Sequence, residues 1–292
     1  MSRILIALMW LAHLLPLRLL AVLGDAIGVA AFWLIRERRE VTRINLAKCF
    51  PAMAPRAREA LARAHFRAFC RGILDRSVLW SGSRARIERM IRIEGLEQLR
   101  AAMANPVGAP ILLLVPHFAG LDAGLMRLVC EVPIAGIYAN PKDPVLGDWL
   151  RRGRGRFGNL QQISRQQGVR AGLPWIRKGW PFYYLPDQDY GPRGALFVPF
   201  FGVPAATMPG LSRIARLTGA RVLPCVTRML PGGAGYVLQI EPPWDNFPTH
   251  DPAADTRRMN EYIERRVLEM PEQYLWMHKR FKTRPPGEER FY

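Results

Sequence analysis

The first 35 residues constrain the fold most, because they form an almost continuous apolar stretch. Between residues 4 and 35 this stretch is interrupted by His13, Pro16, Arg18 and Asp25. Residues 19–35 are about long enough to cross a hydrocarbon core of ~30 Å as a helix, if Asp25 is tolerated there. We therefore predict an N-terminal membrane-anchoring helical segment over residues 1–36, either embedded in the bilayer or lying at its surface.

Two other interpretations of this segment are possible from the sequence. A cleaved signal peptide would need a small-x-small cleavage site before a polar mature start, and the sequence has none. A helical hairpin buried in a soluble core remains the second alternative. An arginine cluster follows directly, at Arg36, Arg38, Arg39 and Arg43. Because such clusters stay on the cytoplasmic side of a membrane, we expect the rest of the chain on that side.

Residues 37–292 alternate between strand-like and helix-like segments, which predicts an α/β fold. The apolar run 111–115, stopped by Pro116, is typical of a buried strand in a mainly parallel central sheet flanked by helices. Further strands are expected at 91–99, where a turn leads into a helix ending at Asn105-Pro106, and at 134–138, 182–185, 221–227 and 236–240. Helices are expected at 55–80, 123–130, 144–157, 169–178, 211–218 and 256–270. With no internal repeat or linker, residues 37–292 are predicted to be one domain.

Charge and cysteine content narrow the function classes. The 42 Lys and Arg residues against 24 Asp and Glu give a formal net charge of +18. Such a surplus attracts an anionic partner: nucleic acid, an acidic protein, a phosphorylated lipid or a membrane face. The four cysteines are far apart and form no C-x-x-C pair, which argues against a zinc knuckle or a disulfide scaffold.

The most informative local motif is His117 followed by Asp122. His117 comes directly after the predicted buried strand, where α/β folds place ligands and catalytic groups. Gly120 lets the chain turn, so that the Asp122 carboxylate is expected to hold the Nδ1–H of His117 and leave Nε2 free as a base. The alternative is a helix cap at Asp122 beside a structural histidine.

Other catalytic signatures are missing from the sequence. There is no G-x-S-x-G, no H-E-x-x-H, no G-x-x-x-x-G-K-[ST], and no G-x-G-x-x-G after a strand. A base without a protein nucleophile is suited to activating a substrate hydroxyl or water.

Two further clusters carry charged candidates. The Arg-Gly block at 151–158 includes Arg154 and Arg156, whose guanidinium groups can bind phosphate or carboxylate, although a charged surface loop is the alternative. RNA binding would need an aromatic platform that this block lacks, so no nucleic-acid partner is predicted. Asp187 and Asp189 follow a predicted strand and could orient an arginine, cap a turn or bind a metal; because further ligands are scarce nearby, no metal is expected.

Two aromatic segments follow. The run at 196–202 would build an apolar wall, suited to a hydrocarbon chain or to ordinary core packing. Aromatic and basic residues interleave at 274–285, which suits a membrane interface; His278 within it is assigned a structural role.

Together these features resemble the late acyltransferases of lipid A biosynthesis, the lauroyl/myristoyl acyltransferase family, within the H-x4-D/E lysophospholipid acyltransferase superfamily. The resemblance covers nearly the whole chain, including the anchor, His117 with Asp122, and the block around Arg154. Its most specific parts are 186–189 with 197–202, and the ending 276–285. Members often carry glutamate where this chain has Asp122, although aspartate is the superfamily norm.

The resemblance implies a glycerolipid-acyltransferase-like fold and an inner-membrane enzyme with its catalytic domain on the cytoplasmic side. It implies transfer of a fatty acyl group from acyl carrier protein to an anionic glycolipid, at the 3-hydroxyl of a hydroxyacyl chain on a phosphorylated glucosamine disaccharide. An imidazole, with an ordinary pKa of about 6.5, can take the hydroxyl proton and contribute roughly 10²–10⁴-fold.

The same resemblance suggests a role for each candidate. His117 and Asp122 would be catalytic, while Arg154, Arg156, Asp187 and Asp189 would bind substrate or organise the site. No cofactor, metal or covalent acyl-enzyme is implied. Alternatives are an acyltransferase acting on a lysophospholipid or another glycolipid, a hydrolase that uses water, and a non-enzymatic protein that binds anionic membranes.

Overall fold

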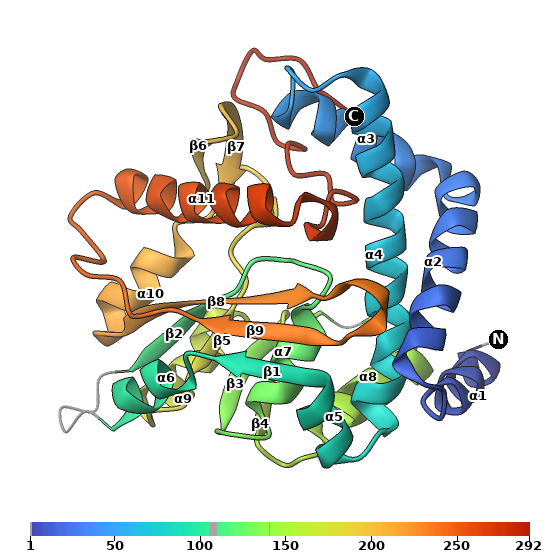
Figure 1. Cartoon of the computed structure of the whole chain (residues 1–292). Helices are drawn as coiled ribbons and strands as arrows, with labels where there is room; N and C mark the ends of the chain where they lie inside the picture. Colours follow the sequence, from blue (N-terminus) through green and yellow to red (C-terminus); the bar gives the residue numbers. More distant parts are fainter. Residues whose placement is uncertain (1, 105–109, 140) are drawn as a thin grey trace.

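The computed structural model describes residues 2–104, 110–139 and 141–292 (Figure 1). Its main sheet has seven strands in the order β1-β9-β8-β2-β5-β3-β4, and β6 and β7 form a separate hairpin. The strands are β1 (Ile91–Glu94), β2 (Ile111–Leu114), β3 (Ile134–Tyr138), β4 (Leu160–Ser164), β5 (Phe182–Tyr184), β6 (Leu196–Phe200), β7 (Val203–Thr207), β8 (Arg221–Met229) and β9 (Tyr236–Ile240). All neighbours in the main sheet are parallel except β8 and β9. The predicted α/β class with a mainly parallel sheet is confirmed.

Helices cover both faces of this sheet (Figure 1). They are α1 (Ser2–Ala12), α2 (Leu17–Leu34), α3 (Arg36–Cys49), α4 (Pro55–Ser81), α5 (Arg84–Met90), α6 (Leu96–Met103), α7 (Leu121–Leu128), α8 (Pro144–Gly155), α9 (Leu173–Arg177), α10 (Gly210–Thr218) and α11 (Pro252–Glu269), with 3₁₀ turns η1 (Val169–Gly172), η2 (Pro231–Gly233) and η3 (Pro271–Gln273). Along β2, Leu112 and Leu114 pack into one apolar cluster, while Ile111 and Leu113 pack into a second. Side chains alternate between the faces of a strand, so both faces of β2 are buried, as its continuous apolar run predicts.

Three strands, β4, β6 and β7, were not predicted from the sequence. Strand β4 was not predicted, because its sequence LQQIS has two glutamines and lies at the sheet edge. The aromatic run 196–202 forms most of the β6–β7 hairpin, which turns at Phe201 and Gly202, both with positive φ. Phe200 from this run is fully buried in the core. The expected helix end at Asn105-Pro106 lies outside the described residues.

The C-terminal segment corrects a further expectation. Residues 274–285 were predicted to lie at a membrane interface, but Trp276, Arg280 and Phe281 are almost completely buried. The Arg280 guanidinium donates to the Ala206 carbonyl oxygen at 3.0 Å and to Thr207 Oγ1 at 2.7 Å. Hydrogen bonding of this kind lets an arginine be buried, so Arg280 and the aromatic side chains beside it belong to the protein interior, whereas Lys282 of the same segment is exposed.

The two N-terminal helices expose most of the apolar surface of the molecule. Of the twenty large apolar side chains that are exposed among the described residues, fourteen belong to residues 4–35. Helix α2 is long and apolar enough to cross a membrane, and only 28% of it is buried. The alternative of a hairpin buried in the core therefore does not fit the structure.

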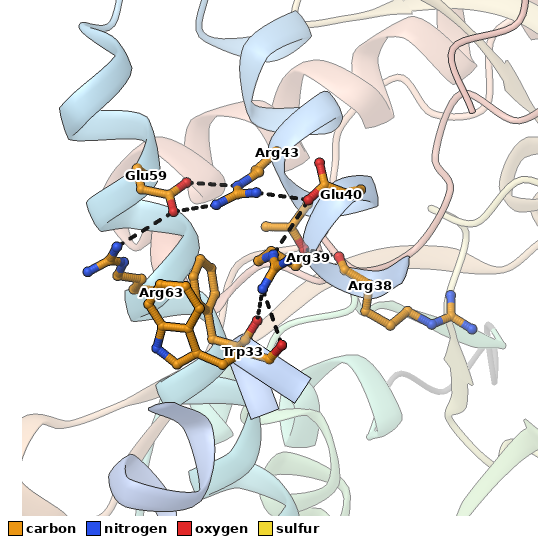
Figure 2. A network of polar contacts seen from close by, with 9 residues as sticks. Trp33, Arg38, Arg39, Glu40, Arg43, Glu59 and Arg63 are labelled. Atoms are coloured by element: carbon orange, nitrogen blue, oxygen red, sulfur yellow. Dashed lines mark hydrogen bonds and ion pairs between the residues drawn. The ribbon is translucent and has the colours of Figure 1, made fainter. Parts of the chain in front are cut away.

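Helix α2 nevertheless packs along α4, at the right of the view in Figure 1. This close approach depends on Gly28, where an added Cβ would lie 2.5 Å from Arg67 Cα. Figure 2 shows the polar network that fixes the end of α2. Arg39 Nη1 donates to the carbonyl oxygens of Phe32 and Trp33 at 3.0 and 3.2 Å, and Arg43 forms two hydrogen bonds of 2.9 and 2.6 Å to Glu59 of α4. The arginine cluster thus ties α2 to α3 and α4.

Candidate active site

His117 lies just beyond the carboxyl end of β2, the central strand of the sheet. Two loops support it: the Val115 N–H donates to the Tyr184 carbonyl at the end of β5, and the Leu275 N–H donates to the His117 carbonyl at 3.0 Å. Gly120 follows, and an added Cβ there would lie 2.8 Å from the Thr227 carbonyl oxygen of β8. The histidine loop is therefore packed against the sheet and the C-terminal segment.

The imidazole of His117 is held by Asp187. His117 Nδ1 lies 2.6 Å from Asp187 Oδ1, and the His117 backbone N–H donates to Asp187 Oδ2 at 2.9 Å. Asp187 is buried, which alone would raise the pKa of its carboxyl, but the charge and hydrogen bonds of His117 hold that pKa below its ordinary value. With Nδ1–H donating to this carboxylate, Nε2 is the nitrogen that carries the lone pair.

Gln188 contacts the other side of the ring. Its side-chain amide nitrogen lies 3.1 Å from His117 Nε2, so the amide donates to the lone pair. A substrate hydroxyl that gives its proton to Nε2 must replace this amide. Gln188 lies within the motif 186–189, but nothing in the sequence pattern predicted its contact with His117.

The expected pairing of His117 with Asp122 is wrong. Asp122 stands in the first turn of α7, and Arg154 of α8 donates to its Oδ1 from Nη2 at 2.9 Å and from Nε at 3.1 Å. Arg76 of α4 approaches the other oxygen, with Nε 2.7 Å from Oδ2. Asp187 reaches the imidazole instead because β5 pairs with β2, which brings the carboxyl ends of both strands to the same edge of the sheet.

The two arginines explain the acidity of Asp122. Burial of this carboxyl would raise its pKa, but the charges and hydrogen bonds of Arg154 and Arg76 lower it to about 2. The three groups together leave one net positive charge beside His117. Arg76 was missed by the sequence analysis, because nothing in the amphipathic pattern of α4 distinguishes it from the other arginines of that helix.

The remaining predicted site residues have different places. Asp189 accepts hydrogen bonds from the Thr283 N–H at 2.6 Å and the Thr283 hydroxyl at 2.8 Å, so it ties the segment after β5 to the C-terminal segment. His278 Nε2 accepts from the Asp189 N–H at 3.0 Å, and burial lowers the pKa of His278 to about 4. Arg156 points away from the site: its Nη1 donates to the Leu79 carbonyl at 3.1 Å, near the end of α4.

Two pockets meet at His117. The larger, of about 630 Å³, has a mostly apolar lining that includes Leu121, Leu125, Ile137, Leu150, Val169 and Leu185, with Asp122, Arg154 and Gln188 among its polar members. The smaller, of about 180 Å³, is lined by residues of α4, of the histidine loop and of the C-terminal segment: Phe69, Gly72, Ile73, Arg76, Phe118, Ala119, Leu121, Gln273 and Leu275. His117 lines both, so the imidazole is accessible from two directions. Residues 196–202 line neither pocket.

Among residues 2–104, 110–139 and 141–292, no group of three or more His, Cys, Asp or Glu side chains is arranged to hold a metal ion. His117 Nε2, which lies beside a buried positive charge and an apolar pocket, can perform proton transfer.

Comparison with known proteins gives the family. The family model described as bacterial lipid A biosynthesis acyltransferase matches residues 2–283. The lipid A biosynthesis lauroyltransferase of Escherichia coli (strain K12) is 34% identical over 97% of this chain and 91% of its own length. The palmitoleoyltransferase of the same strain is 32% identical over 98% and 92%, and the myristoyltransferase is 32% identical over 87% and 78%. A solved structure of the 1-acyl-sn-glycerophosphate acyltransferase PlsC from Thermotoga maritima is 15% identical, with a TM-score of 0.41, over 94% of this chain and 99% of that chain. With a match over nearly its whole length, the chain belongs to the bacterial lipid A biosynthesis acyltransferases.

Proposed function

We propose that this O-acyltransferase moves a fatty acyl group from acyl carrier protein to a hydroxyl of a phosphorylated glucosamine disaccharide lipid, with His117 as the general base. The observation that carries the proposal is the place of one imidazole between two pockets, with Nδ1 held by the buried Asp187 and Nε2 in contact with the Gln188 amide. Family membership supports the acyl transfer and the lipid A precursor as acceptor.

The reaction follows from this geometry. The acceptor hydroxyl replaces the Gln188 amide at Nε2, and its oxygen attacks the thioester carbonyl as Nε2 takes its proton. The carbon–sulfur bond then breaks, and the proton passes from the imidazolium to the departing thiolate. Asp187 keeps the ring in the tautomer that can accept a proton and stabilises the imidazolium by its charge.

The charged cluster of Asp122, Arg76 and Arg154 binds anionic groups of the substrates or of the reaction. Each arginine lines a pocket, Arg154 the larger and Arg76 the smaller. Their single net positive charge is suited to an acceptor phosphate or to the oxyanion that forms at the carbonyl. Asp122 is thus assigned a positioning role for the arginines, and Arg156 is assigned no contact with substrate.

Each pocket is assigned to a different substrate. The larger, mostly apolar pocket suits the fatty acyl chain of the donor. The smaller pocket borders α4, the helix on which the apolar α2 packs. Because α1 and α2 expose the apolar surface that a bilayer would cover, the lipid acceptor reaches His117 from that side.

The localisation proposed is the cytoplasmic face of the inner membrane. One face of α2 is packed along α4, whose sequence includes many arginines, so α2 cannot cross the bilayer without drawing those charges toward it. The pair α1–α2 therefore enters one leaflet, with Trp33 and the arginines of Figure 2 at its polar boundary. We keep residues 1–36 as the anchor and 37–292 as the acyltransferase domain.

The test is an assay with lauroyl carrier protein and a tetra-acylated disaccharide lipid in detergent, with the products identified by mass. His117→Ala is expected to lose transfer by roughly 10²–10⁴-fold while it still folds and binds membranes. His250→Ala, in an exposed loop, is the matched control and should keep full activity. Retained turnover in His117→Ala would disprove the mechanism. Acylation of a lysophospholipid in preference to the disaccharide would change the acceptor, and release of free fatty acid as the main product would indicate a hydrolase.

A further inference from the structure

Four exposed arginines belong to segments that line or adjoin the larger pocket. Arg165, after β4, lines the pocket, is exposed, and lies over the ring of Tyr190 at 4.7 Å. Arg170 follows the lining residue Val169 in η1, and Arg213 stands in α10, one turn after the lining residue Gly210. Arg193, in the loop after Tyr190, completes the set. We name Arg165, Arg170, Arg193 and Arg213 the arginine rim.

The charge of this rim is not compensated. Between residues 149 and 240 the sequence has thirteen arginines and lysines but only two acidic residues, Asp187 and Asp189. Both carboxylates are buried and already bound, one to His117 and the other mainly to Thr283. Within the described part of the chain, none of the four rim guanidinium groups has a carboxylate or hydrogen-bond partner, although exposed arginines elsewhere, such as Arg84 and Arg100, are paired.

The part of the rim on α10 is also separate from the apolar surface of α2. In Figure 1, α10, which carries Arg213, lies at the left edge of the molecule, whereas α2 lies at the right edge beyond α4. A bilayer that covers α2 therefore does not reach α10. The uncompensated charge around the pocket faces the aqueous side, where an acidic protein rather than a lipid headgroup is available to bind it.

We propose that the arginine rim is the docking surface for the acidic acyl carrier protein, which inserts its thioester arm through the exposed end of the larger pocket toward His117. This inference rests on the proposed function for the identity of the donor, and adds where that donor binds. It follows that the two substrates approach His117 from different sides: the carrier protein over the rim and the lipid acceptor past α4.

The experiment compares two double charge reversals. Arg170→Glu/Arg213→Glu changes two rim residues that do not line the pocket, so the acyl chain site itself is left intact. Arg89→Glu/Arg265→Glu makes the same change of charge at two exposed positions on α5 and α11, away from both pockets. Each variant is assayed with lauroyl carrier protein and, separately, with lauroyl-pantetheine, a thioester without the protein.

The rim variant is expected to raise KM for lauroyl carrier protein by about tenfold or more, with kcat and the rate with lauroyl-pantetheine unchanged. The control variant should keep the wild-type KM for both donors. Added salt should lower kcat/KM of the wild type toward that of the rim variant, because it screens exposed charges.

Three results would overturn the proposal. Equal KM values for the rim and control variants would place docking elsewhere while leaving the proposed function intact. An equal loss with lauroyl-pantetheine would show that the rim arginines act on the acyl group or on folding, not on the protein. A wild-type enzyme that uses lauroyl-pantetheine but not lauroyl carrier protein would refute the donor in the proposed function, and the docking surface with it.

Discussion

Replacement of Asp187 by asparagine tests the imidazole arrangement most directly. The two oxygens of Asp187 have different tasks: Oδ2 accepts the His117 backbone N–H at 2.9 Å, and Oδ1 accepts the ring Nδ1–H at 2.6 Å. An asparagine has one acceptor oxygen and one NH₂ donor. Its oxygen must face the backbone N–H, because the opposite orientation would bring two donors together in a buried site. The NH₂ group then faces Nδ1, so the ring proton moves to Nε2 and the base is lost.

The size of the effect follows from the role of the base. A general base contributes roughly 10²–10⁴-fold, so Asp187→Asn is expected to lower kcat by that factor, which corresponds to about 2.7–5.4 kcal/mol of transition-state stabilisation. The change of tautomer is a second readout: the ¹⁵N chemical shifts of the His117 ring should show protonation at Nε2 in place of Nδ1. The assay is acyl transfer to the disaccharide lipid at saturating donor.

Asp189→Asn is the matched control, two residues away and equally buried. It weakens the contacts to Thr283 but does not touch His117, so it should lower the melting temperature while the ¹⁵N pattern of His117 stays that of the wild type. If Asp187→Asn keeps kcat within threefold of the wild type, or if its His117 keeps the proton on Nδ1, Asp187 is not the residue that sets the tautomer.

Three further predictions concern stability, each measured by unfolding in detergent. The Asp122 carboxyl has a pKa of about 2 when folded and 3.8 when unfolded, so its ionisation stabilises the fold above pH 3.8. As the pH falls to about 2, the free energy of unfolding of the wild type should decrease by about 2 kcal/mol relative to that of Asp122→Asn. Parallel curves of unfolding free energy against pH for the two proteins would contradict the ion pairs. Burial lowers the pKa of His65 from 6.5 to about 4, so the neutral imidazole contributes fully to stability above pH 6.5. The free energy of unfolding should fall by about 3 kcal/mol as the pH is lowered toward 4, and His65→Phe should not show this decrease. Gly28→Ala places a Cβ 2.5 Å from a backbone atom of α4 and should lower the free energy of unfolding by about 1–3 kcal/mol. Gly147→Ala, whose Cβ meets nothing closer than 3.5 Å, should be neutral or stabilising. Equal effects of the two substitutions would show that α2 does not pack as described.

Local sequence pattern was sufficient for the elements that place His117. The apolar run that forms β2, the stop at Pro116 and the glycine at position 120 are contiguous in the chain, and each reports a local requirement: burial on two faces, the end of a strand, and close approach to β8. The expected helices 55–80 and 256–270 likewise correspond to α4 and α11. Strand β4 escaped because its polar sequence records an edge position and not a buried one.

The carboxylate partner of His117 could not be predicted from local sequence pattern. Asp187 is seventy positions away, and only the strand order, with β5 beside β2, brings it to the imidazole. The short spacing between His117 and Asp122 suggested contact, but a carboxylate in the first turn of α7 points to α4 and α8, where two guanidinium groups bind it. Which carboxylate meets which cation depends on tertiary packing, and that is not encoded in spacing along the chain.

Asp187 binds His117 while Asp122 binds Arg76 and Arg154, and this division explains why the site needs two aspartates. Arg76 and Arg154 carry like charges and approach each other in a partly buried place, which is unfavourable unless a carboxylate lies between them. Asp122 supplies that carboxylate, and its low pKa keeps it ionised wherever the enzyme works. Were Asp122 also bound to His117, the positive charge of the imidazolium would compete with the arginines for the same oxygens. With Asp187 serving the imidazole, the proton can move on and off Nε2 without disturbing the arginines, and their net positive charge stays available for an anionic group of the substrate.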